Sequence, residues 1–267
     1  MSQAAVMTWP VEAISQAITP LLPGFALELL PEVDSTNAEL MRRAQAGRCE
    51  SCLLLAERQS AGRGRLGRPW HAGTSWSDSL TFSLGMPLAP KDWSGLSLAV
   101  GLSLAQSLHP EIRIKWPNDL WWRQRKLAGI LIETVTWSGL GASRYVVIGV
   151  GLNIVAPAVD GLATDPAGLV ELLPGIDAGQ ALLRLAQPLV QTIKRFEGQG
   201  FAPFQADFNA RDALAQMAVT LSDGLQGVAQ GVDGAGALLV QTAQRVQRVI
   251  SSEVSVRPLR GPSPGVG

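Results

Sequence analysis

The chain has 267 residues, and its 22 Lys and Arg residues balance 22 Asp and Glu residues. Charged residues make up 16% of the sequence, against about 25% in a typical soluble domain. The 46% of hydrophobic residues suffice for a buried core, so the composition indicates a globular protein and excludes a polybasic-tail protein or an acidic solvating chain. Because single cores stop growing near roughly 250 to 300 residues, we expect one large and one small domain.

The sequence shows no targeting or membrane-spanning segment. Residues Met1–Thr8 lack a basic stretch followed by an apolar one, and no later segment has the roughly eighteen consecutive apolar residues that a membrane span needs. We therefore expect a cytoplasmic protein without membrane contact. Cys49 and Cys52 form a C-x-x-C pair, but His71 and His109 are not spaced as a second ligand pair. We interpret the cysteines as structural or exposed thiols rather than as a redox pair or half of a zinc site.

Apolar periodicity and turn residues predict helices and strands in the first 155 residues. Pro10 and Pro20 bound the first helix, because proline is tolerated in a first turn and stops a helix further on. Thr36 and Glu39 have the spacing of a capping box, so a second helix is expected to start there and to run to Gly47. The further predicted elements are a helix over Trp93–Leu108 and strands over Phe25–Leu30, Leu53–Ala56, Leu80–Gly85, Ile112–Lys115, Leu120–Trp122, Leu127–Trp137 and Tyr145–Ile154.

In the remainder of the chain, two helical patterns are followed by a series of short apolar segments. Helical patterns cover Ala178–Glu197 and Phe201–Asp212. From about Ala218, Asp-Gly and Gly-x-Gly turns separate short apolar segments, which predicts a small β-barrel; the segments are Val219–Leu221, Gly227–Ala229, Leu238–Val240 and Val254–Val256. Sequential strands with short connections favour antiparallel pairing, so the expected fold class is α+β. We place the two domains at residues 1–213 and 214–260, followed by a disordered tail at 261–267.

A long irregular segment runs from Glu57 to Ser79 and concentrates positive charge. Its four arginines are Arg58, Arg63, Arg65 and Arg68, and no acidic side chain occurs between Glu57 and Asp78. Glycine lets backbone N–H groups approach a ligand, and arginine offers a planar fork for phosphate or carboxylate oxygens. Three interpretations are open: a solvated surface loop, a nucleic-acid contact with Trp70 stacking on a base, and a site for a nucleotide or an acyl phosphate.

This arginine loop does not match the common phosphate-binding fingerprints. The chain has no G-x-x-x-x-G-K-[ST] motif. Residues 62–67 match G-x-G-x-x-G as a string, but they stand in the middle of a loop rather than between a strand and a helix of a βαβ unit. A Walker-type site and a Rossmann dehydrogenase are therefore disfavoured.

Five motifs, taken in order, carry a family resemblance. They are Asp34-Ser35-Thr36-Asn37, Gln59 through Gly67, Lys115-Trp116-Pro117-Asn118-Asp119, Lys126-Leu127-Ala128-Gly129-Ile130-Leu131 and Gly149-Val150-Gly151-Leu152-Asn153-Ile154. In this order and spacing they closely resemble the biotin protein ligases, over about residues 30 to 155, with a weaker likeness in the C-terminal segment. The resemblance implies a mixed, mainly antiparallel catalytic domain of the biotin/lipoate ligase type, related to class II synthetases, and a small SH3-like β-barrel. Few residues precede Ser35, so we expect the monofunctional type that lacks the N-terminal DNA-binding domain.

The resemblance also implies a reaction. Its members activate biotin with ATP to biotinyl-5'-AMP and transfer the biotinyl group to a lysine of the biotin carboxyl carrier protein of a carboxylase. The biotin carboxylate and the triphosphate repel each other, so cations must bring them together. By resemblance the catalytic residues are Arg63, Arg65, Lys126 and Asp119, and Asp119 also holds Mg²⁺ on the phosphates. The plainer alternatives are a turn aspartate at 119 and a solvated hairpin lysine at 126.

Two sets of binding residues follow from the same resemblance. The implied biotin-binding residues are Ser35, Thr36, Asn37, Gln59, Gly62, Arg63, Lys126, Gly129, Leu131 and Gly149. The implied ATP- or adenylate-binding residues are Arg65, Arg68, Trp70, Lys126 and Asn153. Biotin requires a mostly apolar slot with a few polar anchors for its ureido ring. Thr36 can at the same time be the N-cap of its helix, and Trp70 can instead be a core residue.

The second half-reaction leaves one role open. The acceptor amine must lose a proton, and the sequence offers no convincing general base; Asp119 is the nearest guess, while His71 and His109 are poor ones. We expect the carrier to dock beside an exposed sheet edge and a homodimer to form through a similar edge. DNA binding is not expected, because the charge balance leaves no broad basic face.

Three competing functions remain to be separated. A lipoate-protein ligase shares the fold and the adenylate chemistry but needs a longer slot, and the arginine loop with the Lys-Leu-Ala-Gly motif favours biotin. An octanoyltransferase needs a cysteine nucleophile, whereas Cys49 and Cys52 precede the loop. A non-enzymatic nucleic-acid-binding protein that uses the loop is disfavoured by the sequence pI of about 6.7. Leu66, and Trp76 to Ser79, depart from the family pattern, but we expect neither departure to abolish activity.

Overall fold

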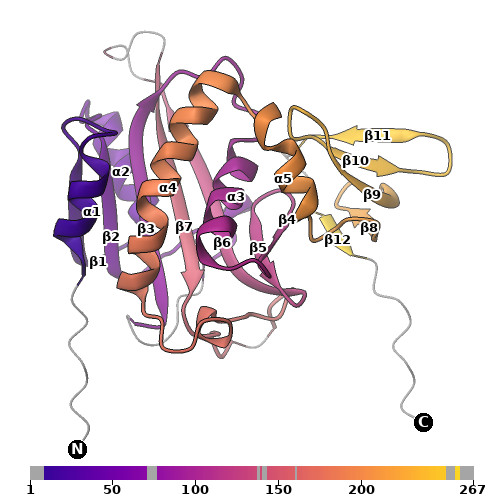
Figure 1. Cartoon of the computed structure of the whole chain (residues 1–267), viewed down its shortest axis with the longest axis horizontal. Coiled ribbons are helices and arrows are strands. Elements are labelled where there is room, and N and C mark those ends of the chain that lie inside the picture. The colour runs from indigo at the N-terminus through magenta and orange to yellow at the C-terminus, as the bar shows by residue number, and fades with distance from the viewer. Residues whose placement is uncertain are drawn as a thin grey trace, which may run out of the picture.

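A seven-stranded mixed sheet forms the centre of the molecule (Figure 1). The computed structural model describes residues 9–70, 77–136, 139, 143–159, 161–250 and 256–258. The strand order is β1-β2-β3-β7-β6-β5-β4; β1 and β2 pair in parallel, and the other neighbours pair antiparallel. The strands are β1 (Ala26–Val33), β2 (Cys52–Gln59), β3 (Ser79–Leu88), β4 (Arg113–Lys115), β5 (Asp119–Trp122), β6 (Arg125–Val135) and β7 (Arg144–Asn153). The mixed, mainly antiparallel sheet expected from the sequence is confirmed.

Helices cover both faces of this sheet (Figure 1). They are α1 (Val11–Ile18), α3 (Leu96–Leu108) and α4 (Ala178–Gln199) on one face and α2 (Thr36–Gln45) on the other. Side chains alternate between the two faces of a strand. In β2, Leu53 and Leu55 join the large core under α1, α3 and α4, whereas Leu54 packs with Leu40 and Ala44 of α2. The apolar run of β2 is therefore continuous because both of its faces are buried.

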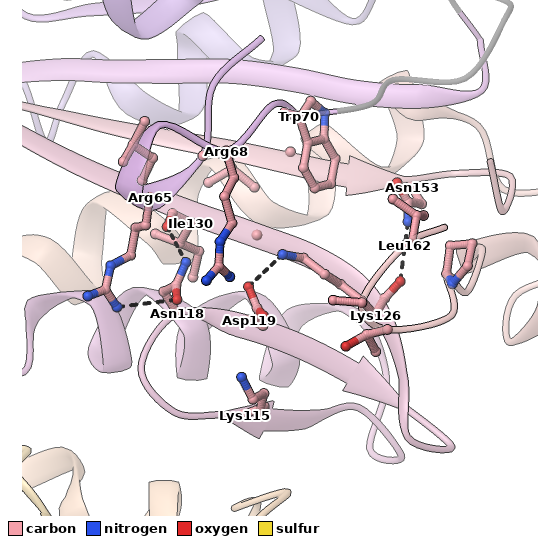
Figure 2. Close-up of a pocket in the computed structure, with 18 of the residues that line it drawn as sticks. Arg65, Arg68, Trp70, Lys115, Asn118, Asp119, Lys126, Ile130, Asn153 and Leu162 are labelled. Atoms are coloured by element: carbon pink, nitrogen blue, oxygen red, sulfur yellow. Dashed lines mark hydrogen bonds and ion pairs between the residues drawn. The ribbon is translucent and has the colours of Figure 1, made fainter. Parts of the chain in front are cut away.

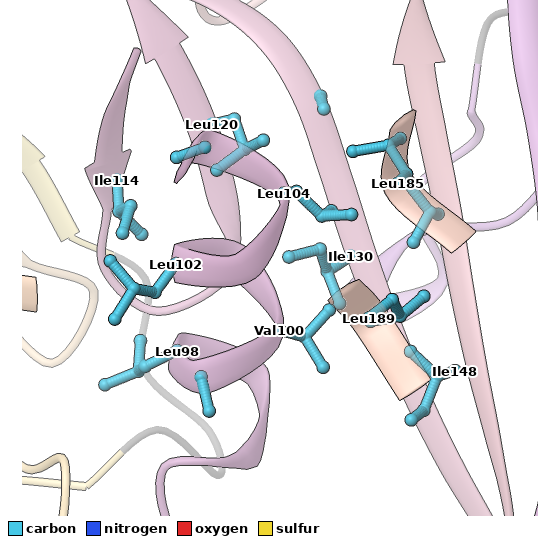
Figure 3. Close-up of a cluster of buried hydrophobic side chains, with 14 of the residues drawn as sticks. Leu98, Val100, Leu102, Leu104, Ile114, Leu120, Ile130, Ile148, Leu185 and Leu189 are labelled. Atoms are coloured by element: carbon cyan, nitrogen blue, oxygen red, sulfur yellow. The ribbon is translucent and has the colours of Figure 1, made fainter. Parts of the chain in front are cut away.

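The α3 helix is buried on nearly every side, because it packs on the sheet and against α4, which lies beside it on the same face (Figure 3). Its side chains fill the space between Ile130 of the sheet and Leu185 and Leu189 of α4. A Cβ at Gly101 would lie 3.3 Å from the Ile114 side chain, so this small residue lets the helix approach the sheet closely. Burying each aliphatic side chain here stabilises the fold by about 1.5 to 3 kcal/mol. This face of the sheet is filled by core, and the open part of the α2 face is left for a site.

The start of α2 differs from the sequence expectation. Ser35, not Thr36, is the N-cap, and its side chain accepts a 3.4 Å hydrogen bond from the Ala38 N–H. The predicted capping box of Thr36 and Glu39 is therefore wrong: Thr36 is the first helical residue, and the Glu39 carboxylate forms ion pairs with Arg42 and Arg43, each at 2.8 Å. An arginine one turn ahead outcompetes the helix's own N-terminal N–H for this carboxylate. The predicted end holds, because the helix stops at Gln45 and Gly47 has φ +83°.

A second, five-stranded antiparallel sheet lies beside the first (Figure 1). Its order is β11-β10-β9-β8-β12, with β8 (Ala218–Leu221), β9 (Gln226–Val232), β10 (Leu238–Gln241), β11 (Val246–Val249) and β12 (Val256–Pro258). This arrangement confirms the small C-terminal β domain, although β11 was not predicted. Trp116 is buried and its Nε1 donates a 3.1 Å hydrogen bond to the Gly236 carbonyl, which ties the β4–β5 turn to the second sheet. The domain boundary at 213/214 stays a prediction, and the tail at 261–267 lies outside the described residues.

One predicted helix is corrected, and the structure adds observations on the cysteines and on the described side chains and helices. The single helix predicted over Phe201–Asp212 is a 3-10 turn at Ala202–Phe204 followed by the short α5 (Gln205–Ala210). Cys49 and Cys52 are free thiols, and burial raises the pKa of Cys52 to about 12. Over the described residues, no cluster of three or more His, Cys, Asp or Glu side chains could hold a metal ion. Among the helices that the structure describes, none is long and apolar enough to cross a membrane. His71 lies outside the described residues.

Candidate active site

A cavity of about 720 Å³ lies on the α2 side of the large sheet. Its walls are the N-terminus of α2, the arginine loop, the β5–β6 hairpin, residues 162–166 and β12 of the small domain. The predicted site residues that line it are Ser35, Thr36, Asn37, Gln59, Arg63, Arg65, Arg68, Trp70, Asp119, Lys126, Gly129, Leu131, Gly149 and Asn153. Gly62 is the exception: it lies behind the wall, where its carbonyl accepts the Trp70 N–H at 2.9 Å. The fold thus gathers in one place motifs that the sequence keeps far apart.

One end of the cavity is lined by the neutral side chains of Thr36, Asn37 and Gln59, which hydrogen bonds hold in place. The Thr36 N–H donates to Gln59 Oε1 at 2.8 Å, and the Thr36 hydroxyl lies 2.7 Å from the Ser83 hydroxyl. The Ser83 hydroxyl donates in turn to Asn37 Oδ1 at 2.6 Å. The Asn37 amide then donates to Glu133 Oε2 at 2.9 Å. Thr36, Asn37 and Ser83 are buried, and fully connected buried groups of this kind hold their orientation.

Glycines form the floor of the cavity where other side chains need room. Residues 149 and 151 of β7 lie on the same face of the sheet, since side chains alternate along a strand. A Cβ at Gly149 would collide with the Asn37 side chain, and a Cβ at Gly151 would lie 2.6 Å from Cζ2 of Trp70. Gly129 pairs with Gly151 across the strands and lies under the same ring, since a Cβ on Gly129 would lie 3.5 Å from Trp70 Cζ3. The glycines therefore let Asn37 and Trp70 rest directly on the sheet.

The arginine loop folds back on itself as a small hairpin over the cavity. The Gly64 N–H donates to the Arg68 carbonyl at 2.7 Å, and the chain turns through left-handed conformations at Leu66, with φ +58°, and Gly67. Arg65 NH1 donates to Asn118 Oδ1 at 3.4 Å (Figure 2). Burial lowers the pKa of Arg65, although the guanidinium stays charged. Arg63 and Arg68 are exposed at the rim. The loop thereby places guanidinium groups at the rim and in the wall of one cavity.

Lys126 and Asp119 form an ion pair in the wall of the cavity (Figure 2). The Lys126 Nζ lies 2.8 Å from Asp119 Oδ1 and 5.9 Å from the centroid of the Trp70 ring. A β-bulge between the pairs Leu120–Ala128 and Trp121–Lys126 changes the register of β6 by one residue. The bulge brings Lys126 to the same face as Gly129, three residues further on.

Asn153 supports this wall from behind. Its buried amide donates to the carbonyl of Lys126 at 3.3 Å and to that of Ala167 at 3.1 Å. The same backbone of Lys126 is held by the Asp165 carbonyl, which accepts the Lys126 N–H at 2.8 Å. Because the amide nitrogen of Asn153 already donates to two backbone carbonyls, a ligand would contact the other atoms of this side chain.

Several residues of the cavity lining, and two that lie behind it, were not assigned a role from the sequence. Lys115 and Asn118 belong to the same sequence motif as Asp119, and this motif could have drawn attention to them. Gly151 also stands in a motif, but the ring that covers it comes from a distant loop. Ser83 of β3 and Glu133, two residues after the Lys126 motif, do not line the cavity themselves but contact Asn37, which does. No local pattern marks Ser83 or Glu133, because their roles depend on contacts with Asn37 across the sheet.

Positive charge dominates the lining of this cavity. The cationic lining residues are Arg63, Arg65, Arg68, Lys115, Arg123, Arg125, Lys126 and Arg257, and the acidic ones are Asp119 and Asp165. The chain as a whole is neutral, so the fold concentrates its cations around one opening. Such a site favours a ligand with several negative charges at this end and neutral polar groups at the other.

Comparison with known proteins gives a consistent result. Residues 29–153 match the model of the biotin/lipoate A/B protein ligase family, and residues 218–257 match that of the biotin protein ligase C-terminal domain. The chain is 31% identical over 259 residues to the bifunctional ligase/repressor BirA of Escherichia coli, covering 93% of this chain and 79% of the relative. It is 33% identical over 242 residues to the biotin–[acetyl-CoA-carboxylase] ligase of Mycobacterium tuberculosis, covering 85% and 88%.

Solved structures show the same similarity. The biotin protein ligase of Aquifex aeolicus in complex with biotin and ATP superposes with a TM-score of 0.71 at 26% identity, covering 88% of this chain and 99% of that one. A ligase from Helicobacter pylori, at 20% identity and a TM-score of 0.57, shares the fold.

Proposed function

The chain belongs to the biotin/lipoate A/B protein ligase family, and from this premise we propose that it activates biotin with ATP and transfers the biotinyl group to a lysine of a biotin carboxyl carrier protein. One observation carries the proposal: a single cavity has neutral hydrogen-bonding groups at one end and a surplus of cations at the other. Biotin joins a neutral ureido ring to a carboxylate, and ATP brings further negative charge. The two ends of the cavity match these two chemistries.

The neutral end is the proposed subsite for the ureido ring. Ser35, Thr36, Asn37 and Gln59 supply donors and acceptors whose directions are fixed by their own hydrogen bonds. Leu131 and Gly149 provide the apolar floor beside them. A ligand that pairs with such groups is favoured over one that leaves them unsatisfied by about 1 to 3 kcal/mol for each group. This cost is the basis of the proposed preference for a ureido ring over an apolar ring.

The cationic end is the proposed subsite for the reacting groups. A biotin carboxylate oxygen attacks the α-phosphorus of ATP, the bond from that phosphorus to the bridging oxygen breaks, and pyrophosphate leaves with the electron pair. Lys126 carries a compact ammonium that can contact both the carboxylate and the α-phosphate. Arg63, Arg65 and Arg68 screen the two anions from each other, and the turn at Leu66 gives the loop a shape that can close on the adenylate.

A magnesium ion fits the donors at this end when phosphates are present. Asp119 and Asn118 offer a carboxylate and an amide oxygen in the cavity wall. Mg²⁺ is commonly held by one or two carboxylates together with substrate phosphates and water. We propose Asp119 as the residue that holds Mg²⁺, and the ion would neutralise charge on the phosphates there.

The second half-reaction joins the biotinyl group to the carrier. The lysine amine attacks the acyl carbon of the mixed anhydride, an amide forms, and AMP leaves. This requires a deprotonated amine close to the cavity mouth. Asp119 remains the proposed base, because it is the acidic side chain nearest to Lys126 in the described lining. Docking of the carrier beside a sheet edge, a homodimer through a similar edge, and a cytoplasmic location also stay predictions.

A lipoate-protein ligase is the alternative on the same fold. Its substrate ends in an apolar dithiolane ring, which offers no hydrogen-bonding group to Thr36 and Asn37 in the cavity lining. The buried polar end of the cavity therefore favours biotin.

The proposal is tested by offering both acids to the enzyme. The purified chain is mixed with ATP, Mg²⁺, an apo carrier domain and either biotin or lipoate, and the carrier is weighed by mass spectrometry. A carrier whose acceptor lysine is replaced by arginine serves as the matched control. We expect a gain of one biotinyl group on the intact carrier alone, and no gain with lipoate. A lipoyl gain, or no gain with either acid, would overturn the proposal.

A further inference from the structure

Lys115 is a cation in the wall of the cavity to which the proposed reaction assigns no role. It closes β4, and its side chain extends toward the Asp119 and Lys126 pair (Figure 2). Within the described residues its ammonium forms no hydrogen bond or ion pair, and its one polar contact is with the Trp121 ring, 5.5 Å from the centroid. Burial lowers the pKa of Lys115, and the attraction of Asp119 does not offset this effect. A desolvated ammonium without an anion is unfavourable, so the site gains when an anion binds.

Lys115 stands at one end of a row of paired residues that crosses four strands of the sheet. Gly151, Gly129, Asp119 and Lys115 lie directly opposite one another across β7, β6, β5 and β4. Directly opposed residues of antiparallel strands project to the same face. The row therefore begins under the Trp70 ring, passes the Asp119 pair with Lys126, and ends at Lys115.

The distances along this row separate the two lysines. Strands lie about 4.8 Å apart, so the Lys115 backbone is about 10 Å from Gly129, whereas a Cβ on Gly129 would lie 3.4 Å from the Lys126 Nζ. The neutral subsite at Asn37 and Gly149 is on the far side of Gly129. A ligand anchored there reaches Lys126 first and Lys115 afterwards. The group nearest Lys115 is the part of ATP beyond the α-phosphate.

The two lysines also differ in how well neighbouring charges balance their own. Asp119 lies 2.8 Å from Lys126 and balances its charge. Lys115 feels an attraction to Asp119 together with repulsion from Lys126, Arg68 and Arg65. The positive potential is therefore least compensated at the end of the row, where a multiply charged leaving group would be held best.

We propose that Lys115 is a catalytic residue of the first half-reaction, which binds the β- and γ-phosphate oxygens of ATP and stabilises pyrophosphate as it leaves. The inference rests on the proposed function. As the biotin carboxylate oxygen bonds to the α-phosphorus, the bond to the bridging oxygen breaks and its electron pair departs on pyrophosphate. Lys115 meets this growing charge with an ammonium and transfers no proton. AMP alone remains for the second half-reaction, so that step does not need Lys115.

The two half-reactions separate this role from a structural one. We compare wild type, Lys115→Met, Lys115→Arg and the matched control Lys91→Met, which alters an exposed lysine outside the cavity. Biotinyl-5'-AMP formation is followed by rapid quench, and transfer is followed separately from synthetic biotinyl-5'-AMP to an apo carrier domain. Binding of inorganic pyrophosphate is measured by calorimetry. Circular dichroism and biotin affinity report whether each variant is folded.

We expect Lys115→Met to slow adenylate formation by about 100-fold and to weaken pyrophosphate binding, while transfer stays within about twofold of wild type. Lys115→Arg retains part of the rate and Lys91→Met all of it. Unchanged adenylate formation and pyrophosphate binding would overturn the proposal, as would equal loss in both half-reactions by a folded variant. If Lys115→Met fails to fold, Lys115→Gln and the pyrophosphate affinity of Lys115→Arg decide the matter. Failure of the wild type to biotinylate the carrier would instead contradict the proposed function.

Discussion

The substitution Gly149→Ala tests whether the floor of the cavity sets biotin affinity. The backbone at Gly149 is not left-handed, so alanine can adopt it, but the new Cβ would meet Asn37, with Cγ at 2.8 Å and Nδ2 at 3.2 Å. Real Cβ atoms essentially never approach that closely, so the carboxamide must move. It then loses its hydrogen bonds with Ser83 at 2.6 Å and with Glu133 at 2.9 Å.

The size of the effect follows from the contacts that the displaced carboxamide no longer offers to biotin. An amide can donate one hydrogen bond and accept another, each worth about 1 kcal/mol net, so we expect biotin binding to weaken by about 2 kcal/mol, or about 30-fold in Kd. Isothermal titration calorimetry with biotin alone measures it. Gly198→Ala is the matched control, because a Cβ at that position meets nothing within 4 Å, and its biotin affinity should equal that of wild type.

A double-mutant cycle checks that the effect acts through Asn37. In the Gly149→Ala background, Asn37→Ala should cost much less affinity than it does in wild type, because the carboxamide is already displaced. An unchanged biotin Kd in a folded Gly149→Ala variant would refute the reasoning. So would strictly additive losses in the cycle.

Three further predictions concern the cations and one buried carboxyl. Lys126→Met should lower the rate of adenylate formation by about 100-fold to 1,000-fold while biotin still binds, as measured by rapid quench and calorimetry; a near-normal rate would contradict its role. Arg65→Ala should reduce ATP–pyrophosphate exchange by a similar factor, and normal exchange would remove Arg65 from the mechanism. Burial raises the pKa of Asp212 to about 6 from 3.8, so the folded state holds this proton more tightly than the unfolded state does. The free energy of unfolding of wild type should therefore fall, relative to Asp212→Asn, by about 2 kcal/mol as the pH rises from 4 to 6. Parallel stability curves for the two proteins would show that Asp212 does not titrate in this way.

The succession of strands along the first 155 residues could be predicted because most strands are short apolar runs between turn residues, whereas their order in the sheet was not predicted. β11 escaped prediction for the opposite reason. It is an edge strand with a polar, largely exposed sequence from Val246 to Val249, and one exposed face removes the apolar signal. The start of α2 was misplaced by one residue because Ser35 and Thr36 are both good caps.

The site was predictable to the extent that its motifs are local. Asp119 and Lys126 each stand in a quoted motif, but the β-bulge that brings Lys126 onto the face of Gly129 depends on pairing between two strands. Gly151 depends in the same way on the Trp70 ring, which arrives from a loop eighty residues earlier in the chain. Sequence patterns can identify such residues, whereas the pairing register between strands determines which of their side chains come into contact.

The adenylate itself gives the most direct test of the account. The chain is incubated with biotin, ATP and Mg²⁺ in the absence of any carrier, and the bound small molecule is extracted and weighed while released pyrophosphate is counted. We predict one biotinyl-5'-AMP and one pyrophosphate per chain, and neither from Lys126→Met on the same timescale. Pyrophosphate release without biotinyl-5'-AMP, or no reaction by the wild type, would contradict the claim that this cavity joins biotin to AMP.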